Sequence, residues 1–151
     1  MIDPHFHFLD PVGNPQQHAT LLKAHPELQP YLPEDYAEDF AGLDVVKAVH
    51  MEVIPDDFEE EVQWVQGLHS AGRCPWLGGI VAAADPSAPD FERVLQGCVA
   101  ASPLVRGVRW ILNWDGPLEP GETPVKDRAT WPRVAKRDYF SDAVFAAQYP
   151  L

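Results

Sequence analysis

The stretch Ile2-Asp3-Pro4-His5-Phe6-His7-Phe8 decides how the rest of the chain is interpreted. Its apolar character predicts a β-strand, and side chains on a strand alternate between its two faces. His5 and His7 are therefore expected to share one face, while Phe6 and Phe8 share the other. Turn-forming residues follow, so the histidines lie near the C-terminal end of the strand, where parallel α/β folds bind ligands.

Two imidazoles on one face admit two interpretations. They can share a divalent cation, or they can be ordinary strand histidines that hold no metal. A His-x-His pair is a short motif that also arises by chance, so its context has to decide between them.

The composition limits the classes of function. The chain has 151 residues, of which 46% are hydrophobic and 23% charged, as in an ordinary soluble single domain. The 16 prolines favour a loop-rich architecture over a helical bundle. A formal net charge of −12 argues against nucleic acid or an anionic membrane as a partner. An anionic substrate would need individually placed arginines.

The cysteines and the apolar runs bear on location. Cys74 and Cys98 are the only cysteines and form neither a metal-ligand spacing nor a disulfide framework, which favours a reducing compartment. No apolar run reaches the roughly 20 residues that a membrane span needs, and the N-terminus lacks a secretory signal pattern. We therefore expect a cytoplasmic protein.

Strand and helix patterns alternate along the chain. Runs of β-branched and apolar residues predict buried strands, and the segments between them carry an apolar stripe at helical spacing. Such alternation predicts βαβ units with a parallel sheet. The expected strands lie near residues 2–8, 45–53, 77–83 and 104–112, and the expected helices near residues 57–71 and 88–101.

Two other segments are less regular. Residues 15–42 are predicted to be mostly loop with a short helix from about Glu34 to Ala41, and long loops after barrel strands are commonly functional. After Asn113 the sequence predicts a long loop to Arg133 and then a helix that begins near Tyr139. Four side chains of the first loop are candidates for a pocket rim, with solvated loop positions as the alternative: His18, His25, Tyr31 and Tyr36.

Charged residues follow the second and fourth expected strands. Glu52 shares a strand face with His50 and, in a barrel, would border the histidine pair as a metal ligand or a proton carrier. The alternative is a capping or solvated glutamate. Arg109 lies nearer the ligand-binding end than Arg106, and its guanidinium fits a substrate carboxylate. The alternative for Arg109 is an ion pair with a neighbouring carboxylate.

Taken together, these motifs resemble the amidohydrolase-related (amidohydrolase 2) family of the metal-dependent hydrolase superfamily, in its lactonase-type branch. Several motifs in the right order are more specific than any one of them. The resemblance rests on Asp3-Pro4-His5-Phe6-His7-Phe8, Val49-His50-Met51-Glu52-Val53, residues 61–64, Val105-Arg106-Gly107-Val108-Arg109, Ile111-Leu112-Asn113-Trp114 and Arg137-Asp138-Tyr139-Phe140.

The resemblance implies an α/β chain that forms part of a TIM-type (β/α)8 barrel and hydrolyses a sugar-acid lactone or similar small cyclic ester. It implies a divalent metal, zinc or manganese, held by His5 and His7, with Glu52 as a catalytic residue. Arg109 and Tyr36 are the expected substrate-binding residues.

The sequence also departs from the family pattern. Leu9 stands where a tryptophan is common, and the family's ligands on later strands have no counterpart. A barrel of this type has roughly 250 residues, so residues 1–151 are expected to be the N-terminal portion of one barrel domain. We expect weak metal binding and no lactone hydrolysis above that in buffer. The alternative is a non-catalytic half-barrel module that associates with itself or a partner through open sheet edges.

Overall fold

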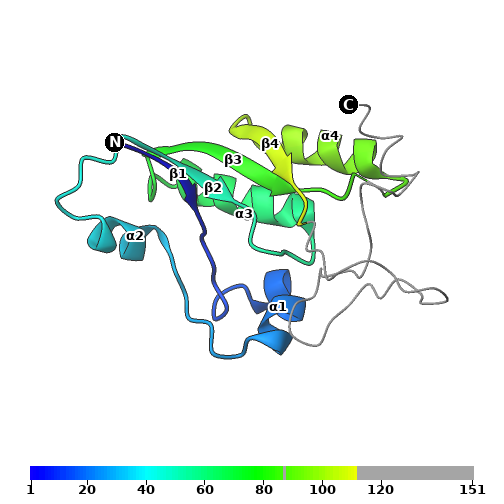
Figure 1. The fold of residues 1–151 in the computed structure, drawn as a ribbon, viewed down its shortest axis with the longest axis horizontal. Helices are drawn as coiled ribbons and strands as arrows, with labels where there is room; N and C mark the ends of the chain where they lie inside the picture. Colours follow the sequence, from blue (N-terminus) through cyan, green and yellow to red (C-terminus); the bar gives the residue numbers. More distant parts are fainter. Residues whose placement is uncertain (87, 112–151) are drawn as a thin grey trace, which may run out of the picture.

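The computed structural model describes residues 1–86 and 88–111. The predicted segment near Tyr139 and the long loop before it lie outside these residues. The described part is α/β, with one four-stranded sheet in the order β1-β2-β3-β4 and every neighbouring pair parallel (Figure 1). The strands are β1 (Ile2–Phe6), β2 (Lys47–Met51), β3 (Leu77–Ala83) and β4 (Val105–Arg109).

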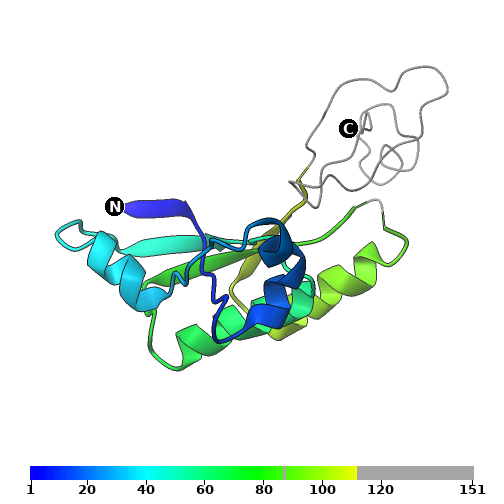
Figure 2. The ribbon, with the colours of Figure 1, turned by 90° about the horizontal axis from the view of Figure 1, so that it is seen from below.

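All four strands occur where the sequence predicts them, although β1, β2 and β4 are shorter. Helix α3 (Phe58–Ser70) joins β2 to β3, and helix α4 (Phe91–Ala101) joins β3 to β4. Both lie on the same side of the sheet, one beside the other (Figure 2). The described part is thus consistent with a series of βα units.

Helix α3 begins and ends as its sequence dictates. The Asp57 side chain caps it by accepting hydrogen bonds from the backbone N–H groups of Glu59 and Glu60, at 3.0 and 2.9 Å. At the other end Gly72 adopts a φ of +76°, a conformation that glycine takes at little cost. The apolar stripe of α3 is buried, and Val62 and Val65 are fully covered.

The core lies between the sheet and these two helices. Phe6 and Phe8 point into it and contact each other at 4.7 Å between ring centroids. The register pairs Phe6 with His50, and His50 stacks on Phe8, so His50 also lies on the helix-covered side. His5 and His7 lie on the other side, as the strand alternation predicts.

The connection from β1 to β2 is more structured than the sequence predicts. It contains the 3₁₀ helix η1 (Pro15–His18) and the helices α1 (Ala19–Ala24) and α2 (Pro33–Asp39). Only α2 corresponds to a predicted helix. Two hydrogen bonds tie η1 and α1 to the loop before α3: Asp56 N–H donates to the Gln17 carbonyl, and Thr20 N–H donates to the Asp56 carboxylate. Within this connection, α1 lies past the C-terminal end of β1 (Figure 1).

Candidate functional site

The histidine pair comes together at the C-terminal end of β1. The Nε2 atoms of His5 and His7 are 3.2 Å apart, and the two rings meet edge to face. His5 is exposed and His7 is half-buried. The strand therefore brings the pair together on the face that α3 and α4 leave uncovered.

His7 is held by a backbone group of the neighbouring strand. Its Nδ1 lies 2.8 Å from the Met51 carbonyl oxygen, and a carbonyl can only accept, so Nδ1 carries the proton. This leaves the Nε2 lone pair directed toward His5. Burial lowers the pKa of His7, which favours the neutral form of the ring. A neutral imidazole with its other nitrogen bonded to a carbonyl is the usual state of a metal-ligating histidine.

The spacing of the pair fits a shared metal ion. Zinc binds histidine nitrogen at about 2.0 to 2.1 Å, so two nitrogens on one tetrahedral ion lie roughly 3.3 Å apart. The observed separation is 3.2 Å. The two nitrogens are thus already at the separation of two ligands on one zinc ion, which is also the separation of a hydrogen bond between the rings.

Glu52 does not join this pair. Its side chain is fully buried. Glu52 is two residues after His50, so strand alternation places both side chains on the helix-covered side of the sheet. Glu52 Oε2 accepts a hydrogen bond from Ile54 N–H at 2.8 Å. Within residues 1–86 and 88–111, no three His, Cys, Asp or Glu side chains are placed to hold one metal ion. The expected sharing of one cation by His5, His7 and Glu52 is therefore not found.

Glu52 instead pairs with Arg109 across the sheet. Arg109 Nε donates to Glu52 Oε1 at 2.7 Å, and its Nη2 donates to the Glu52 carbonyl oxygen at 2.8 Å. Arg109 thus takes the ion pair that the sequence left as an alternative. Its side chain is 28% exposed and lines the same hollow as His7, so it can still reach a ligand.

Tyr36 lies in the core rather than at the pocket rim for which the sequence made it a candidate, and its expected contact with substrate stays a prediction. Its ring stacks between Phe40 and Trp76, each at 4.3 Å between centroids. Its hydroxyl donates to Asp3 at 2.9 Å, and burial raises its pKa. Tyr36 is only 2% exposed and lines neither hollow described below. From α2 the ring also contacts Phe6 of β1, at 4.8 Å between ring centroids.

Sequence reasoning missed a buried polar cluster made of His18, His50 and Glu61. Glu61 Oε1 accepts a hydrogen bond from Val53 N–H at 2.9 Å and lies 3.7 Å from His50 Nε2. His18 is fully buried, and neither of its ring nitrogens makes a well-formed hydrogen bond in the described part. Burial lowers the pKa of His18, while Glu61 and the backbone of Ile54 oppose that shift. The alternative reading of His18 as a solvated loop residue is wrong.

A hollow of about 390 Å³ opens beside His7. Its polar lining consists of His7, His25 and Arg109, which places His25 at a pocket rim as the sequence suggests. Its remaining lining is apolar. The hollow therefore places His7, one member of the histidine pair, beside an apolar surface.

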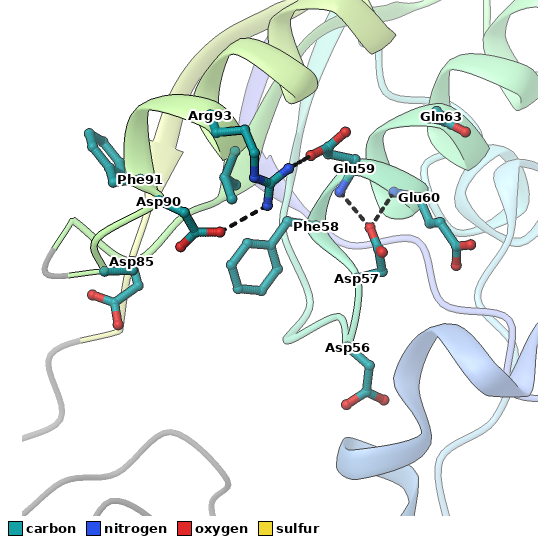
Figure 3. Close-up of a pocket in the computed structure, with 12 residues that line it drawn as sticks. Asp56, Asp57, Phe58, Glu59, Glu60, Gln63, Asp85, Asp90, Phe91 and Arg93 are labelled. Carbon is teal, nitrogen blue, oxygen red and sulfur yellow. Dashed lines mark hydrogen bonds and ion pairs between the residues drawn. The ribbon is translucent and has the colours of Figure 1, made fainter.

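A second hollow, of about 570 Å³, lies between the N-terminal ends of α3 and α4 and does not include the pair. Half of its lining residues carry carboxylates. Figure 3 shows Arg93 between Glu59 and Asp90, and Arg93 contacts each of them at 2.9 Å. The hydrogen bond that Arg93 donates to Asp90 lowers the pKa of the Asp90 carboxyl group. Arg93 thus balances two of the carboxylates that line this hollow.

Comparisons with protein-family models, with curated proteins and with solved structures found no match for this chain. In the described part, none of the helices is both long and apolar enough to cross a membrane.

Proposed function

We propose that this chain contributes the histidine pair of a metal-dependent hydrolase of the amidohydrolase-related, lactonase type. Its substrate is a small cyclic ester, and the divalent metal is zinc or manganese. The observation that carries the proposal is the 3.2 Å separation of the His5 and His7 Nε2 atoms, combined with the hydrogen bond from His7 Nδ1 to the Met51 carbonyl.

The topology supports this proposal. Four parallel strands in sequential order, with α3 and α4 on one side, are the arrangement of consecutive units in a (β/α)8 barrel. In such barrels the active site lies at the C-terminal ends of the strands. His5 and His7 occupy that end of β1, and Arg109 occupies that end of β4. We therefore propose the barrel as the fold to which the described sheet belongs.

The residues have distinct roles in this proposal. His5 and His7 hold the metal, which when bound polarises the ester carbonyl and lowers the pKa of a bound water. Arg109 has two nitrogens engaged by Glu52, and its Nη1 can donate to a substrate carbonyl oxygen. Glu52 acts as a positioning residue because it fixes this guanidinium at the end of β2.

A zinc titration of the purified chain, followed by isothermal calorimetry, tests the proposal. The unmodified chain should bind one ion weakly, because catalytic zinc sites commonly use three protein ligands and the pair supplies two. The double variant His5→Ala, His7→Ala should lose at least tenfold in affinity. His69→Ala is the matched control, because His69 lies in α3 and binds the Cys74 carbonyl. Equal affinities for the chain and the double variant would falsify the proposal.

Activity is measured in parallel. Hydrolysis of a lactone is followed with zinc or manganese added, and with neither. Metal-dependent turnover that the double variant loses would establish the hydrolase directly. Turnover that persists in the double variant would assign the chemistry to other residues.

One observation favours a second candidate function, a non-catalytic half-barrel module. In the described sheet β1 and β4 are edge strands, and Ile2 of β1 is 63% exposed. Exposed apolar edge positions promote association. Sedimentation equilibrium separates the candidates, because a discrete dimer that Ile2→Lys dissociates, together with no zinc binding, supports the module.

A further inference from the structure

The hollow beside His7 has walls that offer a ligand apolar contact and few hydrogen-bond partners. Its volume of about 390 Å³ is within the usual range for small-molecule sites. Apart from three polar side chains, its lining consists of Leu9, Leu21, Leu28, Val53, Ile54 and Ile111. A polyhydroxylated ligand would lose its hydrogen bonds to water there, and each unreplaced bond is costly.

These walls are part of the folded structure and not a loose surface. Leu9, Leu21 and Ile54 form a second hydrophobic cluster and are 6%, 5% and 5% exposed. Leu9 and Tyr31 exchange two backbone hydrogen bonds, of 3.0 and 2.8 Å, which fix that wall to the loop before α2. The apolar surface is therefore preformed, so a ligand need not order it on binding.

The charges around the hollow are balanced. Arg109 is paired with Glu52 at 2.7 Å, and His25 lies 3.2 Å from a carboxylate oxygen of Glu27. Glu52 already holds two of the three guanidinium nitrogens of Arg109, so a ligand carboxylate can reach only Nη1 and cannot form the two-point contact that an arginine makes with a carboxylate. The site thus favours an uncharged head group with one hydrogen-bond acceptor.

We propose that the ligand of this hollow is a neutral lactone that carries an alkyl chain, and neither a sugar-acid lactone nor a free fatty acid. The alkyl chain packs against the leucine and isoleucine walls, and the carbonyl oxygen lies toward His7 and Arg109. This assignment rests on the proposed function, because it places the ester at the histidine pair. It goes further by naming the substrate class.

The test compares three probes on the full 151-residue chain without added metal, by titration with NMR chemical-shift detection. The probes are δ-decalactone, glucono-δ-lactone and decanoate. We expect δ-decalactone to bind at least tenfold more tightly than either other probe. Tighter or equal binding of glucono-δ-lactone would overturn the apolar assignment, and tighter or equal binding of decanoate would overturn the neutral head group. Absence of binding by all three would overturn the proposal as a whole.

Variants locate the binding site. Leu28→Gln puts an amide into the half-buried rim of the hollow and should weaken δ-decalactone binding roughly tenfold, as expected for a lost apolar contact. Leu43→Gln is the matched control, because Leu43 is 54% exposed and lies outside the lining. Leu28→Trp, which fills the hollow without adding an amide, should also weaken binding. Equal affinities in all variants would show that the probe binds elsewhere.

The two proposals fail separately. Loss of zinc binding to the histidine pair is measured without lactone, and δ-decalactone binding is measured without zinc. If zinc fails to bind but the Leu28 variants weaken δ-decalactone binding, the ligand class stands and the hydrolase does not. If zinc binds and glucono-δ-lactone is preferred, the hydrolase stands and the ligand class is wrong.

Discussion

Arg109 and Glu52 form a two-point contact across the sheet, in which Nε binds the Glu52 carboxylate at 2.7 Å and Nη2 binds the Glu52 carbonyl oxygen at 2.8 Å. The carboxylate is fully buried, so the guanidinium is the charge that makes its burial tolerable. The Arg109 side chain thereby links the C-terminal end of β4 to Glu52, which directly follows β2. The contact fixes the edge of the sheet beside the histidine pair.

Replacing Arg109 should destabilise the fold. We expect Arg109→Met to lower the free energy of unfolding by about 2 kcal/mol, less than a fully buried pair would cost because Arg109 is partly exposed. Urea denaturation of Arg109→Met, Glu52→Gln and the double variant gives the coupling energy, which should be about 1 to 2 kcal/mol.

Arg106→Met provides the control for that experiment. Arg106 is exposed on the same strand and, among the described residues, donates to the backbone carbonyls of Pro103 and Val105. Its replacement should change the stability by no more than about 0.5 kcal/mol. Equal costs at both arginines would contradict the role assigned to the Glu52 contact.

Burial of His18 predicts that stability falls on mild acidification. Its pKa is lowered in the folded chain, so below the unfolded value of about 6.5 the unfolded state binds the proton more readily. The free energy of unfolding should therefore decrease as the pH falls from 7 to 5. One such histidine contributes a slope of at most about 1.4 kcal/mol per pH unit. The groups that act on His18 are Glu61, Asp56 and His50.

The measurement is urea unfolding at several pH values for the unmodified chain and for His18→Met. The variant should show a shallower slope between pH 7 and 5, whatever its absolute stability. Identical slopes would mean that His18 is as easily protonated in the fold as in the unfolded chain. Below this window carboxylates dominate, because Arg73 lowers the pKa of Glu34 to about 2.

The core position of Tyr36 predicts an effect on stability and none on ligand binding. Tyr36→Phe removes the hydroxyl that donates to Asp3 at 2.9 Å and should cost about 1 kcal/mol. Tyr31→Phe, which removes a similar bond to Asp39 in a more exposed place, should cost less. Binding of δ-decalactone should be unchanged in both variants. A weaker complex with unchanged stability in Tyr36→Phe would restore the substrate-binding interpretation.

The strands and the histidine pair could be predicted from the sequence because they depend on local patterns. Runs such as Val45 to Val53 are apolar and β-branched, and alternation alone places His5 and His7 on one face. The position of Glu52 could not be predicted. Strand alternation places Glu52 on the same face as His50, but it does not say whether that face is covered by the helices or carries the histidine pair. The pairing of Phe6 with His50 decides this, and that register depends on contacts between strands that are distant in the sequence.

Glu61 carries two sequence signals that point in opposite directions. It belongs to an acidic run that favours the N-terminal turn of a helix, which suggests a solvated position. Its spacings of four to Val65 and seven to Leu68, however, place it on the apolar stripe of α3, and it is 1% exposed. The burial of His18 had no comparable signal, since η1 is short and its packing depends on the loop around Asp56.

Substitutions of Ile54 should reverse the usual order of stability, in which a glycine variant is less stable than an alanine variant. The φ of Ile54 is +56°, a left-handed conformation that is strained for a β-branched residue by roughly 1 to 2 kcal/mol. The strain is held in place because Ile54 N–H binds Glu52 and its side chain is 5% exposed within the apolar cluster. Ile54→Ala should lose the packing but keep the strain, while Ile54→Gly loses the packing and relieves the strain. We therefore expect Ile54→Gly to be at least as stable as Ile54→Ala in urea unfolding.

The neighbouring Val53 is the control, because its φ is not in the left-handed region. There the ordinary order should hold, with Val53→Gly less stable than Val53→Ala by about 1 kcal/mol, since glycine gains more freedom on unfolding. If glycine is the worse substitution at both positions, Ile54 is not strained in solution. If the order reverses only at Ile54, the segment between β2 and α3 holds a strained residue in the wall of the hollow, where strain is commonly retained for function.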